Sequence, residues 1–330
     1  MHENNFYTEK LKQKQAILAP MAGYTDAPFR YLANSYGSAW AVTEMVSAKA
    51  LVNGNLQGIE IAAAYKNEKD LVIQIYGREP ELVAEAGQIL FEKYQPKALD
   101  LNMGCPVKKI ISKGMGSSLM QEPELAAKIV NSLVNKVNIP ISVKMRLTYK
   151  DKAAASIIQG LEDAGASLIA IHARTAEQKY TGKANWQEIV KLSKLVKIPI
   201  VGSGDITSQA EFENYSKQGL GIMIARASLG KPWIFASLRG AAEPDKKEIA
   251  KICFKHAVLH CAWYQNIGLN EKQSMQKFRS KLLAYLVFLE DKSELRHIDS
   301  LDNLRQFINS YFNLEIQESD INTKPMQREL

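Results

Sequence analysis

The chain has 330 residues, more than one domain of about 100–200 residues but suited to a barrel of about 250 residues with a smaller addition. With 46% hydrophobic and 23% charged residues it is typical of globular proteins, and no apolar run approaches the ~20 residues that span a bilayer. The polar start lacks the apolar core of a signal peptide, and three cysteines form neither a disulfide set nor a metal-ligand pattern. We therefore expect a cytoplasmic, reduced protein without a metal site or membrane contact.

The net charge of +7 permits a polyanionic partner. Residues 241–330 carry 13 Lys+Arg and 13 Asp+Glu, so the whole excess lies in residues 1–240. Within the neutral part, basic residues still gather between Lys272 and Lys281. A monomer is the default expectation for the oligomeric state.

Short apolar segments alternate with longer amphipathic ones from residue 16 to residue 224. The predicted strands are residues 16–19, 39–43, 71–75, 98–102, 141–144, 168–172, 200–202 and 221–224. The predicted helices between them are residues 79–94, 123–137, 153–164, 186–195 and 208–218. Pro80 and Pro123 suit a first helical turn, and Gly165 and Gly219 suit the position after a helix end.

Eight β-then-α units imply parallel strands with helical crossovers, and eight is the number that closes a TIM (β/α)8 barrel. A doubly wound open sheet is the rival fold, weakened because no Gly-x-Gly-x-x-Gly turn follows the first strand. Beyond Trp233 the alternation stops, and residues 246–264, 272–291 and 301–312 are predicted helices. We therefore predict a barrel over residues 1–240 and a helical domain over residues 241–330, with a polar, mobile tail from residue 315.

One predicted strand is followed by a cysteine in an unusual turn, Asn102-Met103-Gly104-Cys105-Pro106. Ligands and catalytic groups of barrels collect at the carboxyl ends of the strands, and Cys105 follows such an end. A lone cysteine is more often a small buried apolar residue, so Cys105 alone would not identify a site.

Unusual residues follow the other strands as well. Pro20, Met21 and Ala22 begin a turn whose backbone could approach a flat ligand closely, because Ala22 and Gly23 have little side-chain bulk. Gln74 is a polar residue in an apolar strand, as suited to a structural role as to a ligand contact. Lys144 ends one strand and needs an anionic partner. The remaining residues of this kind are His172, Arg174, Ser203, Gly204, Asp205, Ala225 and Arg226.

Glycine-rich turns after the seventh and eighth strands are where TIM barrels bind phosphate. A lysine beside a flat ring stabilises developing negative charge. Flavin mononucleotide (FMN) fits this set of residues, and a sugar-phosphate substrate fits it about as well.

Several segments in the same order then carry a specific resemblance. Residues 20–26, 74–77, 100–106, 143–146 and 230–233, read as PMAGYTD, QIYG, DLNMGCP, VKMR and GKPW, together resemble the tRNA-dihydrouridine synthase family, most like its bacterial B-type members. The similarity runs from about residue 18 to residue 235, and the helical tail suits the family's architecture. The Asn-x-Gly-Cys-Pro turn is the most specific of these motifs.

The resemblance implies FMN-dependent reduction of uridine to 5,6-dihydrouridine in tRNA, with NADPH or NADH as electron donor. It implies that hydride reaches C6 of uracil and that Cys105 protonates C5, which agrees with a thiol being largely protonated near neutral pH. It further implies which residues hold the flavin, namely Pro20, Met21, Ala22, Gln74, Lys144, His172, Ser203, Gly204, Asp205, Ala225 and Arg226. Asn102 and Arg174 are then expected to contact the substrate. Arg279 and Lys281 are also expected to contact it, because together with Tyr285 they lie on a stretch that resembles the family's tRNA-binding helix.

Three positions depart from the family pattern. Ala173 and Ala225 stand where glycine is common, and Ser203 stands where asparagine is common. Each changes a side chain near the expected phosphate site, so the phosphate geometry is expected to differ slightly, and none touches Cys105.

Two other functions remain as alternatives. An FMN-dependent dihydroorotate or dihydropyrimidine dehydrogenase would share barrel and cofactor but would not need the basic excess or the helical addition. An RNA-folding chaperone without chemistry would be colourless when purified. The modified uridine and the choice between NADPH and NADH do not follow from the sequence.

Overall fold

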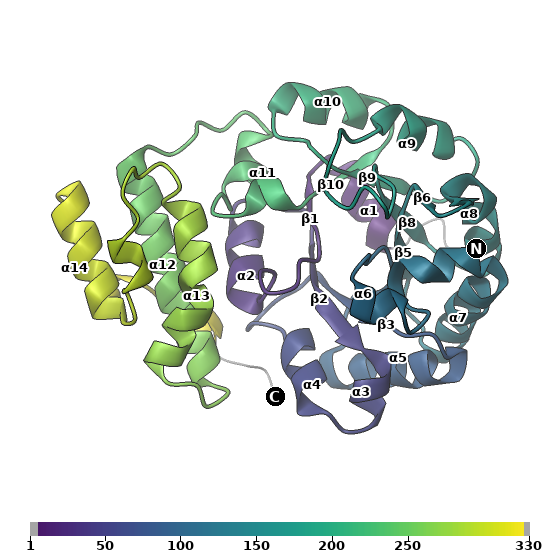
Figure 1. The fold of residues 1–330 in the computed structure, drawn as a ribbon, viewed down its shortest axis with the longest axis horizontal. Coiled ribbons are helices and arrows are strands. Elements are labelled where there is room, and N and C mark those ends of the chain that lie inside the picture. The colour runs from purple at the N-terminus through teal and green to yellow at the C-terminus, as the bar shows by residue number, and fades with distance from the viewer. Residues whose placement is uncertain (1–5, 327–330) are drawn as a thin grey trace.

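The computed structural model describes residues 6–326, with the side chains of Leu56 and Gln57 left out. The polar residues 1–5 and the last four residues of the predicted tail lie outside the described part. Eight parallel strands close a barrel in the order β1-β10-β9-β8-β5-β4-β3-β2, which confirms the predicted TIM barrel (Figure 1). Among residues 6–326, no helix combines the length and apolar character needed to cross a membrane.

The barrel strands lie where short apolar segments were predicted. They are β1 (Ile17–Leu18), β2 (Ala41–Ser47), β3 (Leu71–Tyr76), β4 (Ala98–Met103), β5 (Ile141–Arg146), β8 (Leu168–His172), β9 (Ile200–Ser203) and β10 (Gly221–Ile224). Their side chains divide into two cores, because successive residues of a strand point to opposite faces. One core lies between the strands and the outer helices, and a smaller one fills the barrel interior.

Helices pack around the barrel and across its ends. They are α1 (Phe6–Lys12), α2 (Ala27–Ser35), α3 (Ala48–Val52), α4 (Leu56–Ala62), α5 (Pro80–Tyr94), α6 (Lys108–Ile111), α7 (Pro123–Lys136), α8 (Ile158–Asp163), α9 (Trp186–Leu192), α10 (Gln209–Lys217) and α11 (Ile234–Ser237). Pro80 and Pro123 do begin helices, and Gly165 and Gly219 have φ values of +99° and +83°, the left-handed conformation expected after a helix end.

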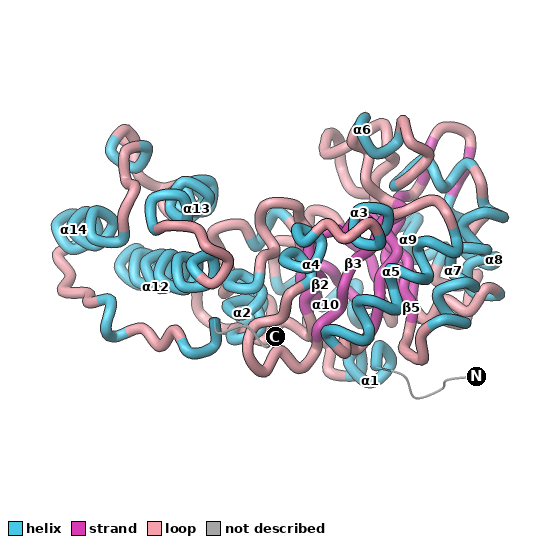
Figure 2. Tube along the Cα trace, turned by 90° about the horizontal axis from the view of Figure 1, so that it is seen from below, coloured by secondary structure: helices cyan, strands magenta, loops and turns pink. Residues whose placement is uncertain are grey.

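Three helices form a second unit beside the barrel (Figures 1 and 2), and α2 and α11 lie on the side of the barrel nearest to it in Figure 1. They are α12 (Lys246–Gln265), α13 (Glu271–Tyr285) and α14 (Leu301–Phe312), and they enclose a hydrophobic core of their own. A smaller cluster joins the units, since Ala27 and Leu32 of α2 pack with Leu259 and Trp263 of α12. Residue 240, the predicted domain boundary, lies in the loop between α11 and α12.

Three predictions of secondary structure were wrong. Residues 153–157 do not begin a helix, because a hairpin of β6 (Thr148–Tyr149) and β7 (Lys152–Ala153) and a 3-10 turn precede α8. The helix predicted to reach residue 291 ends at Tyr285, since Leu286 and Leu289 turn inward to the core while Val287 is exposed.

The third error is the mobile tail, because the described part of it is docked. The amide of Lys66 donates to the carbonyl of Pro325 at 2.9 Å, and Asn266 donates to the carbonyl of Met326 at 2.8 Å. The Met326 side chain is buried against Tyr65 and Trp263. One apolar residue in a polar segment is enough to hold it, and composition alone does not reveal that.

Candidate active site

A cavity of about 1040 Å³ opens at the carboxyl ends of the barrel strands. This volume reaches the upper end of the ~300–1,000 Å³ typical of small-molecule sites, so it can hold a cofactor and a second flat ring. Most of the predicted site residues line it, although they come from strands and loops far apart in the sequence. They are Pro20, Met21, Ala22, Gln74, Asn102, Cys105, Lys144, His172, Ser203, Gly204, Asp205, Ala225 and Arg226.

A buried chain of hydrogen bonds fixes Gln74 in the floor of this cavity. Its amide nitrogen donates to Asp100 at 2.6 Å, and its amide oxygen accepts from Asn102 at 2.8 Å. Ser142 donates to the other oxygen of Asp100 at 2.6 Å, and Tyr7 donates to Ser142 at 2.9 Å. Gln74 is therefore structurally satisfied, and it lines the cavity as a buried side chain with a fixed orientation.

The Cys105 turn is held from both sides. The side-chain oxygen of Asn102 accepts from the amides of Gly104 at 3.2 Å and Cys105 at 3.0 Å, which is an Asx-type turn. On the other side the Cys105 carbonyl accepts from the Ser117 amide at 3.0 Å. Gly116 has a φ of +63°, and a Cβ there would lie 2.6 Å from that carbonyl. Asn102 thus positions the half-buried thiol, besides lining the cavity itself.

Three basic side chains determine the electrostatics beside Cys105. Burial, together with the neighbouring charge of Arg146, lowers the pKa of Lys144 to about 8. Burial and the charges of Lys144 and Arg146 hold the pKa of His172 well below its usual range, so this imidazole is neutral. A neutral histidine can donate from one ring nitrogen and accept at the other.

Arg146 was not predicted as a site residue, yet it joins two loops at the cavity. Its guanidinium donates to the Gly104 carbonyl at 2.9 Å and to the carbonyls of Thr175 and Lys179 at 2.8 Å each. The sequence could have indicated Arg146 as a cavity residue, because Lys144 and Arg146 are two residues apart on a strand and therefore point to the same face.

Tyr180 is another cavity residue that was not predicted from the sequence. It lines the cavity with 58% of its surface exposed, and its ring lies 5.1 Å from the Arg226 guanidinium and 5.7 Å from that of Arg146. These distances fit cation–π contacts. A tyrosine in a polar loop carries no pattern of its own, so only the folded loop reveals this placement.

The turns after β9 and β10 form the far end of the cavity. Gly204 has a φ of +132°, and a Cβ there would lie 2.9 Å from Ala184, so this position takes only glycine. Asp205 pairs with Arg174 at 2.6 Å and with Arg226 at 3.3 Å. Burial opposes its ionisation, but the hydrogen bonds from Arg174 and the Ala184 amide, together with the charges of Arg174 and Arg226, outweigh burial and lower the pKa of Asp205.

Arg174 lies behind this end of the cavity and does not line it. It is buried and donates to the carbonyls of Thr181 at 3.1 Å and Gly182 at 2.6 Å, which anchors the loop that carries Tyr180. Its remaining nitrogen, Nη1, is buried without a hydrogen-bond partner among the described residues and faces Gly204. The expected contact of Arg174 with the substrate is replaced by this anchoring role.

Arg279 and Lys281 lie on α13, and neither lines the cavity. Arg279 is half-buried, whereas Lys281 is only 4% exposed and forms an ion pair with Asp26 at 3.1 Å. Its predicted direct contact with tRNA does not fit this burial, because a phosphate cannot reach a side chain enclosed between two units.

The donor set of the cavity fits a flavin. An amide and an ammonium, Gln74 and Lys144, suit the polar edge of the ring, and the small residues Pro20 and Ala22 allow close approach of a flat surface. At the far end, Arg226 and the Gly204 turn suit a phosphate.

Comparison with known proteins adds independent findings. The chain matches the family model described as dihydrouridine synthase (Dus) over residues 17–315. It is 36% identical over 250 residues to a probable tRNA-dihydrouridine synthase of Rhizobium leguminosarum bv. phaseoli, covering 74% of this chain and 78% of that protein. It is 34% identical over 295 residues to a probable tRNA-dihydrouridine synthase of Treponema pallidum (strain Nichols), covering 82% and 83%.

Among solved structures, the chain is similar to histamine dehydrogenase from Rhizobium sp. 4-9, with a TM-score of 0.54 and 14% sequence identity. The match covers 74% of this chain and 48% of that chain, so the present chain corresponds to about half of the larger enzyme. At this identity the similarity shows a shared barrel fold and nothing further.

Proposed function

The chain belongs to the dihydrouridine synthase family, and from that premise we propose that it reduces the C5=C6 bond of specific uridines in tRNA. The proposed cofactor is FMN, and the proposed electron donor is NADPH or NADH. The enzyme is proposed to be a monomer and to act in the cytoplasm. The observation that supports this proposal most directly is the half-buried Cys105, held by Asn102 in a cavity whose donor set fits a flavin.

A bound flavin, once reduced, supplies the hydride for the substrate ring. The protein's own residues hold and orient the two rings. Gln74, fixed by Asp100 and Asn102, and Lys144 are proposed to bind the polar edge of the cofactor. Arg226 and the turns that contain Ser203, Gly204 and Ala225 are proposed to bind its phosphate, with Asp205 orienting Arg226.

Cys105 is proposed to donate the proton. Hydride addition at C6 of uracil leaves an enolate, because C5=C6 is conjugated to the C4 carbonyl. The S–H bond of Cys105 then breaks, a C5–H bond forms, and the thiolate keeps the electron pair. Lys144 and Arg146 are close enough for their pKa values to respond to the charge of Cys105, so both cations stabilise that thiolate.

Substrate binding requires that a base leave its stack and enter the cavity. Lys108 and Lys179 line the cavity and are exposed, so they are placed to meet the phosphates beside a flipped base. The helical unit, with Arg279 on α13, is proposed to hold the body of the tRNA.

The test is tRNA reduction by wild type and Cys105→Ala, with NADPH as donor and dihydrouridine measured by mass spectrometry. Both proteins are expected to be yellow and to oxidise NADPH, and Cys105→Ala is expected to lose at least ~100-fold in dihydrouridine formation, the range of a removed general acid. Cys261→Ala, which removes a buried thiol of α12, is the matched control. Equal activity of Cys105→Ala and wild type would remove Cys105 from the mechanism.

The same assay tests the alternative function, in which the protein is a dehydrogenase that acts on a free pyrimidine. The basic excess of residues 1–240 favours the tRNA substrate over a free base. If the wild-type enzyme reduces free uracil or orotate and leaves tRNA unmodified, the tRNA proposal is wrong. A colourless protein that binds RNA without reducing it would instead support the chaperone.

A further inference from the structure

Lys281 of the helical unit contacts the loop between β1 and α2, which forms one wall of the cavity. Its ammonium donates to the Gly23 carbonyl and to the Asp26 carboxylate, both at 3.1 Å. It also lies 5.7 Å from the ring of Tyr24, which lines the cavity beside Met21 and Ala22. One side chain of α13 therefore touches three residues of a loop whose neighbouring residues face the cofactor.

The same loop is held from the barrel side as well. The Gly23 amide donates to Glu44 of β2 at 2.6 Å. The Gly23 backbone is thus fixed at its N–H by the barrel and at its C=O by the helical unit, in a conformation of φ +80° that disfavours other residues.

Asp26 is the anchor of this contact. It caps α2 by accepting from the Phe29 amide at 3.2 Å, and Lys281, His260 and Tyr264 all approach its other oxygen, at 3.1, 3.1 and 3.4 Å. Burial disfavours the charged form, but Lys281 and His260 outweigh burial and hold the pKa of Asp26 well below its usual range. The carboxylate is therefore ionised and saturated with partners from the helical unit.

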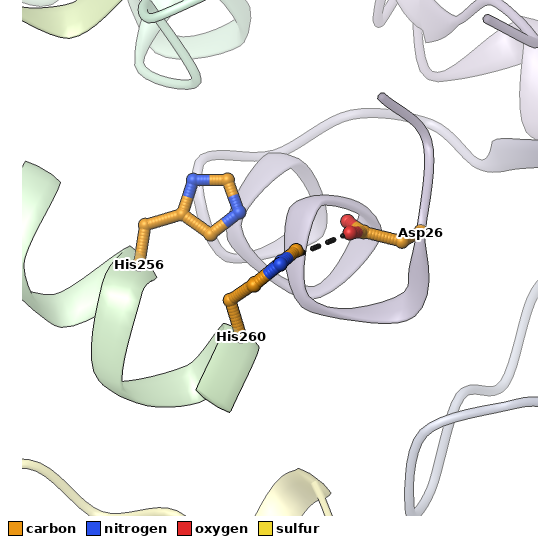
Figure 3. A group of neighbouring side chains, drawn as sticks. All are labelled: Asp26, His256 and His260. Atoms are coloured by element: carbon orange, nitrogen blue, oxygen red, sulfur yellow. Dashed lines mark ion pairs between the residues drawn. The ribbon is translucent and has the colours of Figure 1, made fainter. Parts of the chain in front are cut away.

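Figure 3 shows Asp26, His256 and His260 close together, and their possible ligand atoms lie within 4.8 Å of one another. This spacing resembles a metal site, but the Lys281 ammonium already neutralises Asp26. A divalent cation would add uncompensated positive charge to a buried cluster that holds a cation. The cluster is therefore better explained as a buried electrostatic contact that holds the helical unit against the barrel.

We infer that Lys281 is a positioning residue that couples the helical unit to the cofactor side of the cavity, by holding Gly23 and hence residues 20–24 in place. This inference rests on the proposed function, because it takes residues 20–22 as a wall of the FMN site. It replaces the predicted tRNA contact of Lys281 by an internal role in the same reaction.

The test measures the FMN dissociation constant by flavin fluorescence, with cofactor-free, full-length protein and no tRNA. Lys281→Met keeps the length of the side chain and removes its donors, and Gly23→Ala strains the loop where an added Cβ meets nothing within 4 Å. Each is expected to raise the constant about tenfold, the effect of losing one hydrogen bond to a charged group or of a similar backbone strain. Lys272→Met, an exposed lysine of the same helix paired with Asp299, is the control and is expected to stay within about twofold of wild type.

The double variant Lys281→Met/Gly23→Ala separates positioning from general destabilisation. If Lys281 acts through Gly23, the two effects are expected to be less than multiplicative, whereas loss of global stability would leave them independent. Should Lys281→Met fail to fold, Lys281→Gln, which keeps a donor without the charge, takes its place with a smaller expected increase in the FMN dissociation constant.

An unchanged FMN dissociation constant in the folded Lys281 variant, or multiplicative effects in the double variant, would overturn the inference. Failure of wild type to bind FMN would instead overturn the proposed function, and stoichiometric bound zinc would restore the metal site.

Discussion

Lys144 is a lysine of the cavity whose pKa lies well below the ordinary value. Burial and Arg146 lower its pKa to about 8 in the folded protein, against about 10.4 for lysine in an unfolded chain. Between these values the unfolded state holds the proton more tightly, so the free energy of unfolding rises as pH increases from about 8 to about 10.4. Between pH 7.5 and 9.5, the free energy of unfolding of cofactor-free wild type is expected to rise by about 1–2 kcal/mol more than that of Lys144→Met. Urea unfolding of both proteins measures this, and parallel pH profiles would contradict it.

Asn102 gives a second prediction at this scale, because its side chain serves two neighbours. Its oxygen holds the amides of Gly104 and Cys105, and its nitrogen orients Gln74. Asn102→Ala is expected to lower kcat for tRNA reduction by roughly 10–100-fold, since a misplaced acid loses the alignment on which proton transfer depends. Flavin content should fall much less, because the remaining cavity residues still hold the cofactor. Single-turnover reduction of tRNA, with the flavin content measured beside it, tests the prediction.

Individual site residues were predictable wherever polar or glycine residues ended an apolar strand. The placement of Cys105, Gln74 and Lys144 around one cavity was predicted in this way, because the carboxyl ends of parallel strands meet at one edge. Arg174 and Lys281 were placed wrongly, since a cation beside a site can face the ligand, a neighbouring loop or another unit. Only the tertiary contacts with Asp205 and Asp26 decide that.

At the scale of elements, a buried ion pair fastens α2 to the segment after α4. Arg30 and Glu68 form a two-pronged pair at 2.8 and 2.9 Å, with both side chains fully buried, and Arg30 also donates to the carbonyls of Thr25 and Ala63. Arg30→Met is expected to destabilise the protein by about 3–5 kcal/mol, because it leaves Glu68 buried without its partner. The double variant Arg30→Met/Glu68→Leu is expected to recover part of this loss, as measured by denaturant unfolding. A double variant less stable than Arg30→Met would contradict the argument.

The elements themselves were predictable to different degrees. The eight strands and the long helices were found, because apolar runs and proline or glycine boundaries are local signals. The β6–β7 hairpin was missed because the alanine-rich segment that follows it has helix composition, while the backbone of Ala154 bonds to Leu147 instead. The docked tail was missed because Met326 gains its burial from Tyr65 and Trp263, which are distant in sequence.

For the whole molecule, the uneven charge predicts how tRNA binding responds to salt. The cavity rim carries the exposed Lys108 and Lys179, in the part of the chain that holds the entire excess charge. Each phosphate contact contributes about 0.7–0.9 to the slope of log K against log salt concentration. Lys108→Gln/Lys179→Gln is therefore expected to reduce the slope for tRNA binding by about 1.5, if both side chains meet phosphates.

The control for this prediction removes the same charge elsewhere on the barrel. Lys191 of α9 and Lys217 of α10 are each 74% exposed and pair only with a glutamate one turn away on their own helix. Lys191→Gln/Lys217→Gln is expected to leave the slope within about 0.3 of wild type, because screened surface pairs contribute little. Filter binding at four salt concentrations compares the two double variants. Equal slopes for the two double variants would mean that the positive charge acts on tRNA through the overall field of the molecule. A reduced slope in Lys108→Gln/Lys179→Gln alone would place the tRNA backbone at the cavity.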